Sequence, residues 1–485
     1  MKFKLLFFCW FFPVALSAQT ELMQKQIRED YSIFKNILTS AHPGLYEYTS
    51  QAQWDSLFTH FEEGLNQLKN ADDLFKSMSA LADHVKDGHF IIHHQKMDTV
   101  PSMFPLFIKI IDEKFYADTD DFDIPVGSEI TSVDGINSEE LLNRMLKYAP
   151  SDGYNVTRKY RQIELEFGIL LFYEFGAKKA YTVRCRTPDN LTKTTEIQSQ
   201  SLESIGNRNH NRHSYFSAYH QTTDKAAHFR NTIHRKWPFV YFIDSTNTAV
   251  LTVNSFGVDP QEFKSRLIDI FKEIKKKKTD HLIIDVRQNI GGFRINAINL
   301  FSFISEQVFK QRTSESIITT SLPEQEHIIH TMSDYGQFLE TYFDGAEKKD
   351  DHYVLRTDKA EEMMKPYKKV FKGKIYILTS GKTFSAASAF ALSAKNNHSI
   401  TLVGEETGGG YYFHTGQFPV LYELPNSKIM LRISLIKINH YVRDESVPKG
   451  KGVIPDIEIK LTPQDLIEGK DSQLDYVINE IPKEF

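Results

Sequence analysis

Two stretches decide the fold: HLIIDVRQNIGG at residues 281–292 and IYILTSGKTFSAAS at residues 375–388. Each opens with a short apolar run and then breaks at a glycine-marked turn, which is typical of a buried strand. The second stretch continues into a helical pattern that reaches about residue 395. Strands that alternate with helices predict an α/β layer with a largely parallel core.

Further strands and helices flank these two stretches. AVLTV at 249–253 and ITLV at 400–403 predict strands, and apolar residues at helical spacing over 263–274 predict a helix. The interval from about 312 to 364 is polar, and we expect it to be an insertion. Residues 466–485 are expected to form a C-terminal tail.

The first half of the chain has a different texture. Residues 19–97 are predicted to form a helical N-terminal region that ends at Asp87-Gly88 and leads into a strand at His89. Short strands and one helix are predicted over 98–197, which indicates a β-rich module. Residues 198–238 are polar and without clear period, and we interpret them as a linker.

The N-terminus resembles an export signal. A basic start, an apolar run over 5–16 and small residues before Gln19 are the three parts of a secretory signal peptide. We therefore expect residues 1–18 to be removed and the product to be periplasmic or extracellular. Cys9 follows a bulky phenylalanine, which argues against a lipid anchor, and no later stretch is apolar enough to anchor the chain in a membrane. Cys185 would then be the only cysteine, so no internal disulfide is expected.

Composition argues against two classes of protein. The 485 residues are 41% hydrophobic and 13% aromatic, which is more than a disordered chain carries. The formal net charge is −5, and four consecutive lysines at 275–278 are interpreted as the solvated end of a helix. Nucleic-acid binding usually needs a basic face, so it is not indicated.

Ser385 is a candidate nucleophile. It follows the carboxyl end of a predicted core strand, where ligands bind in α/β layers. It also begins a helix, so its oxygen would meet free backbone N–H groups and the positive end of the helix dipole. That environment suits a nucleophile whose attack generates an oxyanion. The residues alone leave open that Ser385 merely caps the helix, and Ser388, one helical turn on, is a reserve nucleophile.

Five segments in order resemble the tail-specific (C-terminal-processing) serine peptidases. They are DGH at 87–89, AVLTVNSF at 249–256, LIIDVRQNIGGF at 282–293, the run 377–409 with TFSAA and VGEETG, and GVIPD at 452–456. The resemblance implies a crotonase-like ββα-type catalytic core, placed at 239–465. It also implies that residues 98–197, with PVGSEI and VDG, form a PDZ-like module.

The family has two kinds of general base. One branch uses a lysine after the Val-Gly-Glu segment, but that position falls at Gly410, so a serine–lysine dyad is not supported. The other branch includes the tricorn core protease and the interphotoreceptor retinoid-binding repeats, and it has a histidine that His89 matches. The resemblance therefore implies Ser385 as nucleophile and His89 as base. It also implies oxyanion donors, which are the N–H groups of Ala386 and of Gly291 or Gly292.

Two positions depart from the tricorn pattern. The residue before the histidine is a serine there and Gly88 here. A glutamate expected before the Gly-Val-x-Pro-Asp turn aligns near Lys449, which leaves Glu445 as the candidate orienting carboxylate. The resemblance implies an exported serine peptidase acting on proteins or peptides. The alternative is a catalytically weak or inactive protein that binds peptides or hydrophobic ligands.

A histidine cluster offers a third interpretation. His84, His89, His93 and His94 are close in sequence, and such a group can hold a metal ion. No carboxylate with clear geometry accompanies them, and the chain has 18 histidines, so some clustering is unsurprising. We therefore expect neither a metal nor another cofactor.

Overall fold

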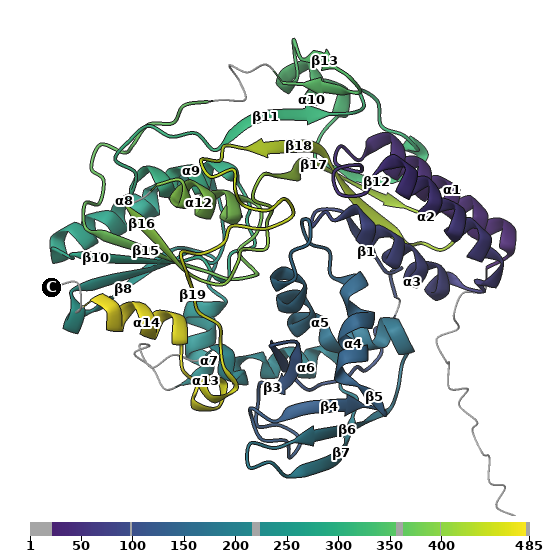
Figure 1. The fold of residues 1–485 in the computed structure, drawn as a ribbon, viewed down its shortest axis with the longest axis horizontal. Helices are drawn as coiled ribbons and strands as arrows, with labels where there is room; N and C mark the ends of the chain where they lie inside the picture. The colour runs from purple at the N-terminus through teal and green to yellow at the C-terminus, as the bar shows by residue number, and fades with distance from the viewer. Residues whose placement is uncertain (1–21, 98, 216–223, 356–361, 398, 482–485) are drawn as a thin grey trace, which may run out of the picture.

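The computed structural model contains three sheets with helices packed around them (Figure 1). The predicted signal peptide lies outside the described residues. The structure describes residues 22–97, 99–215, 224–355, 362–397 and 399–481.

A six-stranded sheet forms the core of the second half of the chain. Its strand order is β19-β16-β15-β10-β9-β8, and all neighbours are parallel except β8 and β9. The bounds are β8 (Phe239–Ile243), β9 (Thr248–Thr252), β10 (His281–Asp285), β15 (Lys374–Thr379), β16 (Ile400–Gly404) and β19 (Ile457–Glu458). The predicted α/β layer with a largely parallel core is confirmed.

Helices cover both faces of this sheet because successive strand residues point to opposite sides. On one face, alternate strand residues such as Leu251 and Ile284 pack against α8 (Pro260–Lys277), α9 (Arg294–Ser302) and α12 (Ala386–Lys395). On the other face, Val250 and Ile283 pack against α14 (Ser472–Glu480). The segment predicted as a C-terminal tail thus contains α14, which supplies the apolar cover of that face.

The predicted lysine-rich helix end is present in α8. Asp259 caps the helix and Pro260 occupies its first turn, while Lys278 closes it in a left-handed conformation. Three lysines, Lys275, Lys276 and Lys277, occupy the last turn, where cations interact favourably with the helix dipole.

A second sheet joins the N-terminal helices to the core. Its strand order is β12-β17-β18-β11-β14-β13, and β1 (Ile91–His93) pairs with β18. The long hairpin β17 (Phe413–Glu423) and β18 (Met430–His440) is central to it and was not predicted. The remaining members are β11 (Arg312–Ile317), β12 (Ile328–Thr331), β13 (Glu347–Lys349) and β14 (His352–Val354), with α10 (Tyr335–Tyr342) beside them. The interval predicted as an insertion thus supplies four strands of this sheet.

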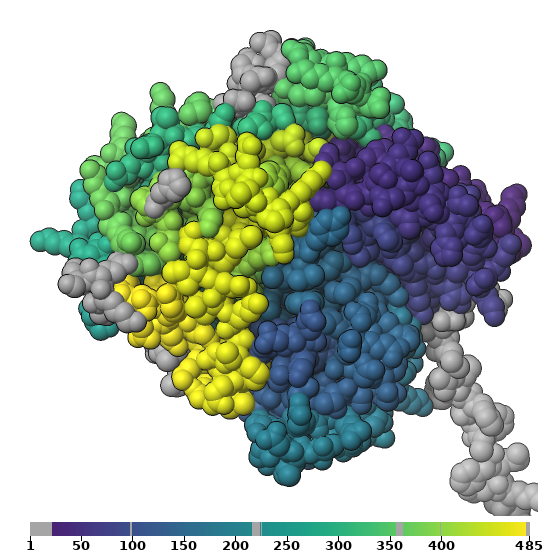
Figure 2. All heavy atoms as spheres, viewed as in Figure 1, coloured from purple at the N-terminus to yellow at the C-terminus, as the bar shows by residue number. Residues whose placement is uncertain are grey.

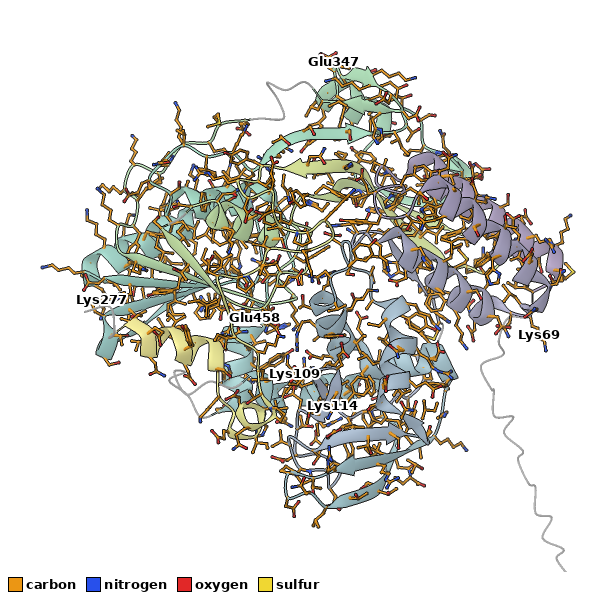
Figure 3. All side chains as sticks on the ribbon, in the orientation of Figure 1. Lys69, Lys109, Lys114, Lys277, Glu347 and Glu458 are labelled. Atoms are coloured by element: carbon orange, nitrogen blue, oxygen red, sulfur yellow. The ribbon has the colours of Figure 1, made fainter. Side chains whose placement is uncertain are left out.

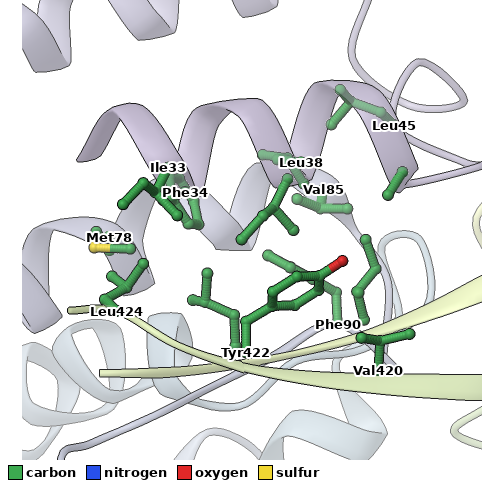
Figure 4. Close-up of a cluster of buried hydrophobic side chains, with 14 of the residues drawn as sticks. Ile33, Phe34, Leu38, Leu45, Met78, Val85, Phe90, Val420, Tyr422 and Leu424 are labelled. Carbon is green, nitrogen blue, oxygen red and sulfur yellow. The ribbon is translucent and has the colours of Figure 1, made fainter. Parts of the chain in front are cut away.

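The N-terminal helices pack on the hairpin through one apolar cluster (Figure 4). They are α1 (Gln24–Ala41), α2 (Gln51–Gly64) and α3 (Ala71–Ala82). Phe34 and Leu38 of α1 face Val420 and Tyr422 of β17, and all four side chains are buried. This contact fixes the segment that follows α3, which carries His89, against the second sheet.

The β-rich module is present and has its own core. Its strands are β2 (Ile108–Ile111), β3 (Lys114–Ala117), β4 (Glu129–Val133), β5 (Ile136–Asn137), β6 (Ala180–Arg186) and β7 (Thr192–Gln198). It contains two α-helices instead of the single one predicted, α4 (Ser138–Met145) and α5 (Thr157–Phe175). The space-filling view shows the module in blue beside the yellow C-terminal segment (Figure 2).

The predicted linker is more ordered than expected. Within 198–238 the structure has α6 (Leu202–Arg208) and α7 (Lys225–His228), while residues 216–223 lie outside the described part. Arg212 is buried and pairs with Asp118 of the β-rich module at 2.6 Å, so this segment is fixed to the module. No helix in the described residues has the length and apolar character needed to cross a membrane.

Candidate active site

Ser385 occupies a strained position at the start of α12. Its backbone angles are φ 55° and ψ −124°, a region that non-glycine residues rarely adopt. Two bonds hold the preceding turn: Thr383 Oγ1 donates to Val286 O at 2.9 Å, and Phe384 N donates to Asn289 O at 3.1 Å. The Ser385 side chain makes no capping hydrogen bond, so it does not serve as a helix cap.

The structure brings His89 to Ser385, although they are 296 positions apart in sequence. His89 Nε2 lies 3.1 Å from Ser385 Oγ, within the range expected for a base and its nucleophile. The His89 ring is stacked between Phe384, at a centroid distance of 4.5 Å, and His414, at 5.5 Å. These two rings restrict the imidazole to the plane in which it meets the serine.

Asp87 is the carboxylate that faces the other side of the imidazole. Its Oδ1 lies 3.9 Å from His89 Nδ1, and that buried nitrogen has no hydrogen-bond partner in the described structure. Asp87 accepts hydrogen bonds from His42 Nε2 at 2.8 Å, from Thr415 Oγ1 at 2.5 Å and from the His89 amide at 2.7 Å. Burial alone would raise the pKa of Asp87, but the His42 and Thr415 hydrogen bonds and the nearby imidazoles hold it below its usual range.

The tautomer of His42 follows from its neighbours. The amide of Gly44 donates to His42 Nδ1 at 3.1 Å, so this nitrogen is the acceptor of the ring. The proton of a neutral His42 must then sit on Nε2, which donates to Asp87. His42 therefore keeps Asp87 in place without needing to be charged.

Asp152 is a second buried carboxylate beside this group. It accepts hydrogen bonds from the amides of Gly88 at 2.7 Å and Gly410 at 2.9 Å. Burial, together with the charge of Asp87, raises the pKa of Asp152 to about 7. Asp87, His89 and Asp152 each offer a ligand atom within 4.8 Å of the others, but the carboxylate oxygens already accept protein hydrogen bonds. This arrangement favours support of the imidazole over metal binding.

Burial also sets the proton affinity of His89. It lowers the pKa of His89 to about 4, against the opposing effect of the Asp87 charge, and the charges of Arg158 and Arg432 add to the lowering. His89 is therefore neutral at neutral pH. Its Nε2 is then available to accept a proton from Ser385.

The predicted oxyanion residues adjoin the serine. A Cβ built on Gly291 would lie 2.8 Å from Ser385 Cβ and 3.1 Å from Ala386 N, and Gly291 has a φ of +102°. Gly292, with a φ of +131°, instead packs against the backbone of Phe256 and Gly257. The Gly291 amide donates to Asn289 Oδ1 at 2.9 Å, so Ala386 N, in the first turn of α12, is the better placed donor for an oxyanion.

Gly88 is required by packing. A Cβ at this position would lie 2.7 Å from the Phe384 ring and 3.1 Å from Asp152 Oδ1. The guanidinium of Arg158 lies 3.5 Å from the centroid of the same ring, so Phe384 has little freedom to move. A serine at position 88 would therefore displace the ring that stacks on His89.

The remaining predicted residues lie in other surroundings. Glu445 is exposed, and its backbone carbonyl accepts a hydrogen bond from Tyr412. Lys449 donates to Glu47 Oε2 at 3.0 Å, so it links the N-terminal region to the core. Ser388 Oγ donates to Thr383 O at 2.8 Å and accepts from the Gly409 amide at 3.0 Å, which gives it a structural role.

The four clustered histidines do not assemble into one site. His94 Nε2 bonds to Asp72 Oδ1 at 2.9 Å, and His93 is exposed on β1. Among the described residues, the three-residue groups with metal-ligand spacing include His89 but not His84, His93 or His94. Four residues of this site received no role from the sequence, and they are His42, Asp87, Thr415 and Asp152. Only Asp87, two residues before His89, had a signal that could have identified it.

Comparisons with known proteins show a family match and a likeness of fold. Residues 247–459 match the model of peptidase family S41. The structure of mature CPAF complexed with lactacystin has a TM-score of 0.65 and 16% identity, and the match covers 95% of this chain and 98% of that one. A structure of mature CPAF gives a TM-score of 0.64 at 16% identity over 94% and 96%. The photosystem II D1 C-terminal processing protease gives 0.40 at 12% over 93% and 98%. No curated protein matches the sequence.

The CPAF likeness is one of fold. At 16% identity it shows that nearly the whole chain, including the N-terminal region and the β-rich module, is arranged as in that protein. The family match covers the segment that carries Ser385, Gly291 and Gly292. His89 lies outside that segment, so its place beside Ser385 rests on the geometry described above.

The packing around Gly88 leads to a stability prediction. We expect Gly88→Ala to lower the free energy of unfolding by about 1–3 kcal/mol, because the added methyl group overlaps the Phe384 ring. Gly64→Ala is the matched control, since Gly64 ends α2 with helical angles and, apart from its neighbours in the helix, no atom of the described residues lies within 4 Å of its added Cβ. The control should be neutral or up to about 1 kcal/mol more stable. Urea unfolding measures both, and equal stability of the two variants would contradict the packing argument.

Proposed function

Residues 247–459 belong to peptidase family S41, and on that premise we propose that the chain is a serine peptidase with Ser385 as nucleophile and His89 as general base. The observation that carries the proposal is the 3.1 Å separation of His89 Nε2 and Ser385 Oγ. The strained backbone of Ser385 supports it, because such strain persists mainly where function requires it.

The reaction would proceed by acyl transfer. Ser385 Oγ attacks the carbonyl carbon of a peptide bond while His89 Nε2 takes the serine proton. The developing oxyanion meets the Ala386 amide at the start of α12, with Gly291 and Gly292 as the neighbouring candidates. His89 then returns the proton to the leaving amine, and water hydrolyses the acyl-enzyme by the same steps.

Asp87 would stabilise the imidazolium that forms on His89. It is held by His42 and Thr415, and its Oδ1 lies 3.9 Å from Nδ1, a separation that can shorten when the ring becomes charged. Asp87 thus takes the orienting role for which the sequence analysis named Glu445. A buried, already ionised carboxylate at this position needs no proton transfer of its own.

Two departures from the tricorn pattern, Gly88 and Lys449, favour the alternative of an inactive binding protein, but the surroundings of both residues weaken that argument. Gly88 is explained by the Phe384 ring, and the lysine at position 449 matters less once Asp87 serves the imidazole. A protein that only binds ligands would have no need for the strained Ser385 backbone beside a neutral buried His89. The enzyme is therefore the function that these contacts support best.

We also propose the finer assignments that the family suggests. Residues 98–197 would act as a PDZ-like module that takes up an extended peptide by strand addition, and residues 239–465 as a crotonase-like core. Substrates would be proteins or peptides. The product would be exported to the periplasm or the extracellular space after removal of residues 1–18, and it would carry no lipid anchor.

Loss of either reacting residue should stop hydrolysis. We expect Ser385→Ala and His89→Ala each to lower kcat/KM on an unfolded protein substrate by at least about 10³-fold, because nucleophile and base act as a unit. Ser385→Ala should also lose labelling by a fluorophosphonate probe. Ser388→Ala is the control, and it should keep labelling while losing about 1 kcal/mol of stability with its two hydrogen bonds. Labelling that survives in Ser385→Ala would overturn the assignment.

If Asp87 and not Glu445 orients the imidazole, substitutions of the two residues should lower kcat to different extents. We expect Asp87→Asn to lower kcat by about 10²-fold or more, since the amide removes the charge that stabilises the imidazolium. Glu445→Gln should lower it less than about tenfold, because that side chain is exposed. Steady-state kinetics at saturating substrate measure both variants. A larger loss in Glu445→Gln than in Asp87→Asn would show that Glu445 is the orienting group.

Export gives a prediction about the N-terminus. The secreted product should begin at or near Gln19, because small residues precede it after the apolar run. N-terminal sequencing and mass spectrometry of the product test this. Recovery of an acylated Cys9, or of an intact N-terminus in the membrane fraction, would contradict it.

A further inference from the structure

A cavity of about 130 Å³ lies at the carboxyl ends of the core strands, apart from Ser385 and His89. Residues at or just beyond the ends of four neighbouring parallel strands line it, namely Thr252, Asp285, Ser380 and Glu405. Much of the remaining wall comes from the β-rich module, from segment 212–215 and from the C-terminal region. Open α/β sheets bind ligands at this edge.

One end of the cavity gathers charged groups. The cations are Lys109, Arg161, Arg212 and Lys382. The carboxylates around them are Asp118, Glu164 and Glu405. Three cations have carboxylate partners: Arg212 with Asp118 at 2.6 Å, Lys109 with Glu164 at 2.9 Å, and Arg161 with Glu405 at 3.1 Å. Four cations against three carboxylates leave one positive charge unmatched.

The unmatched charge belongs to Lys382. Its amine donates to the neutral Gln288 Oε1 at 2.8 Å and lies 5.5 Å from the Tyr215 ring centroid. No carboxylate of the described residues forms an ion pair with it. Burial, with Arg212 and Arg161 nearby, lowers the pKa of Lys382 to about 7, against the opposing charges of Glu164 and Asp118. Arg161, which also lines the cavity, has a buried Nε with no hydrogen-bond partner among the described residues.

The opposite wall has its charges bound to each other. Arg287 lies between Asp285, at 2.7 Å, and Asp471, at 2.6 Å. Lys470 pairs with Glu468 outside the cavity. Two carboxylates on one arginine leave this wall with one negative charge in excess, but neither of them forms an ion pair with Lys382, whose amine bonds to Gln288.

We propose that this cavity is a binding site for a small oxyanion, a sulfate, phosphate or carboxylate group, held by the Lys382 ammonium. Buried charges in proteins are paired, whereas the Lys382 ammonium lines this cavity with no carboxylate of the described residues in ion-pair contact. A volume of about 130 Å³ accommodates a group of that size, since about 10–15 Å³ of such space is enough to hold one water. The anion would join the turn that leads to Ser385, the β-rich module and the segment around Arg212.

Sulfate is a suitable probe because it does not titrate near neutral pH. Acetate is used in a parallel experiment to test whether the site binds carboxylates. We expect calorimetry to show sulfate binding at pH 6 and at least tenfold weaker binding at pH 8.5, because an amine that loses its proton above about pH 7 no longer holds an anion. Sodium chloride at equal ionic strength is the reference. Tighter binding of acetate than of sulfate would assign the site to carboxylates.

Two variants and one control make the test specific. Lys382→Met should abolish binding. Gln288→Glu should also abolish it and raise the melting temperature in the absence of anion, because the new carboxylate sits 2.8 Å from the amine. Lys277→Met, on the exposed end of α8 (Figure 3), should bind as the wild type does.

Two kinds of result would overturn the proposed anion site. Equal sulfate affinity in wild type and Lys382→Met, or undiminished binding in Gln288→Glu, would show an adventitious salt effect only. No calorimetric binding in the wild type at pH 6 would show that Lys382 is simply a neutral amine. Ser385→Ala should retain binding, so this test stands apart from that of the proposed peptidase activity.

Discussion

The buried charge of Asp87 is the constraint on which the site depends. Asp87 is only 7% exposed, so its carboxylate must receive hydrogen bonds, and the donors come from distant parts of the chain. His42 follows α1, Thr415 lies on β17, and the His89 amide belongs to the segment before β1. Leaving a buried group without one of its hydrogen-bond partners typically costs about 1–3 kcal/mol, and more when the group is charged. The N-terminal helices and the hairpin therefore cannot separate without exposing the charge that supports the imidazole.

The same arrangement explains how two halves of the chain form one site. Ser385 is positioned by the parallel core, whereas His89 is positioned by helices that pack on the second sheet. The two halves meet where Arg158 lies on Phe384, Phe384 stacks on His89, and His89 stacks on His414. Gly88 has no side chain because that stack fills its space. The 3.1 Å contact is thus set by packing as much as by polar partners.

The sequence predicted the parallel core because its strands are short apolar runs that end at glycine-marked turns, and β10 and β15 are of this kind. It did not predict β17 and β18, since Phe413–Glu423 mixes glycine, proline and polar residues, and its burial depends on α1 and α2 lying over it. Ser385 and His89 were found through motifs. Asp152 had no local signal, because its role arises from amides of Gly88 and Gly410, which are 64 and 258 positions away. Likewise α14 is amphipathic but short, and only the sheet face beneath it reveals its purpose.

Two buried carboxylates, Asp87 and Asp152, lie near the His89 imidazole and differ in how readily they ionise. Asp87 is kept ionised by its donors, and its charge opposes ionisation of Asp152, whose pKa rises to about 7. In the proposed reaction, the imidazolium that forms on His89 would meet the charge of Asp87, which is already present in the resting site, so no second proton has to move. Burial outweighs that charge and lowers the pKa of His89 to about 4, so the ring would hold the serine proton only until it passes to the leaving amine.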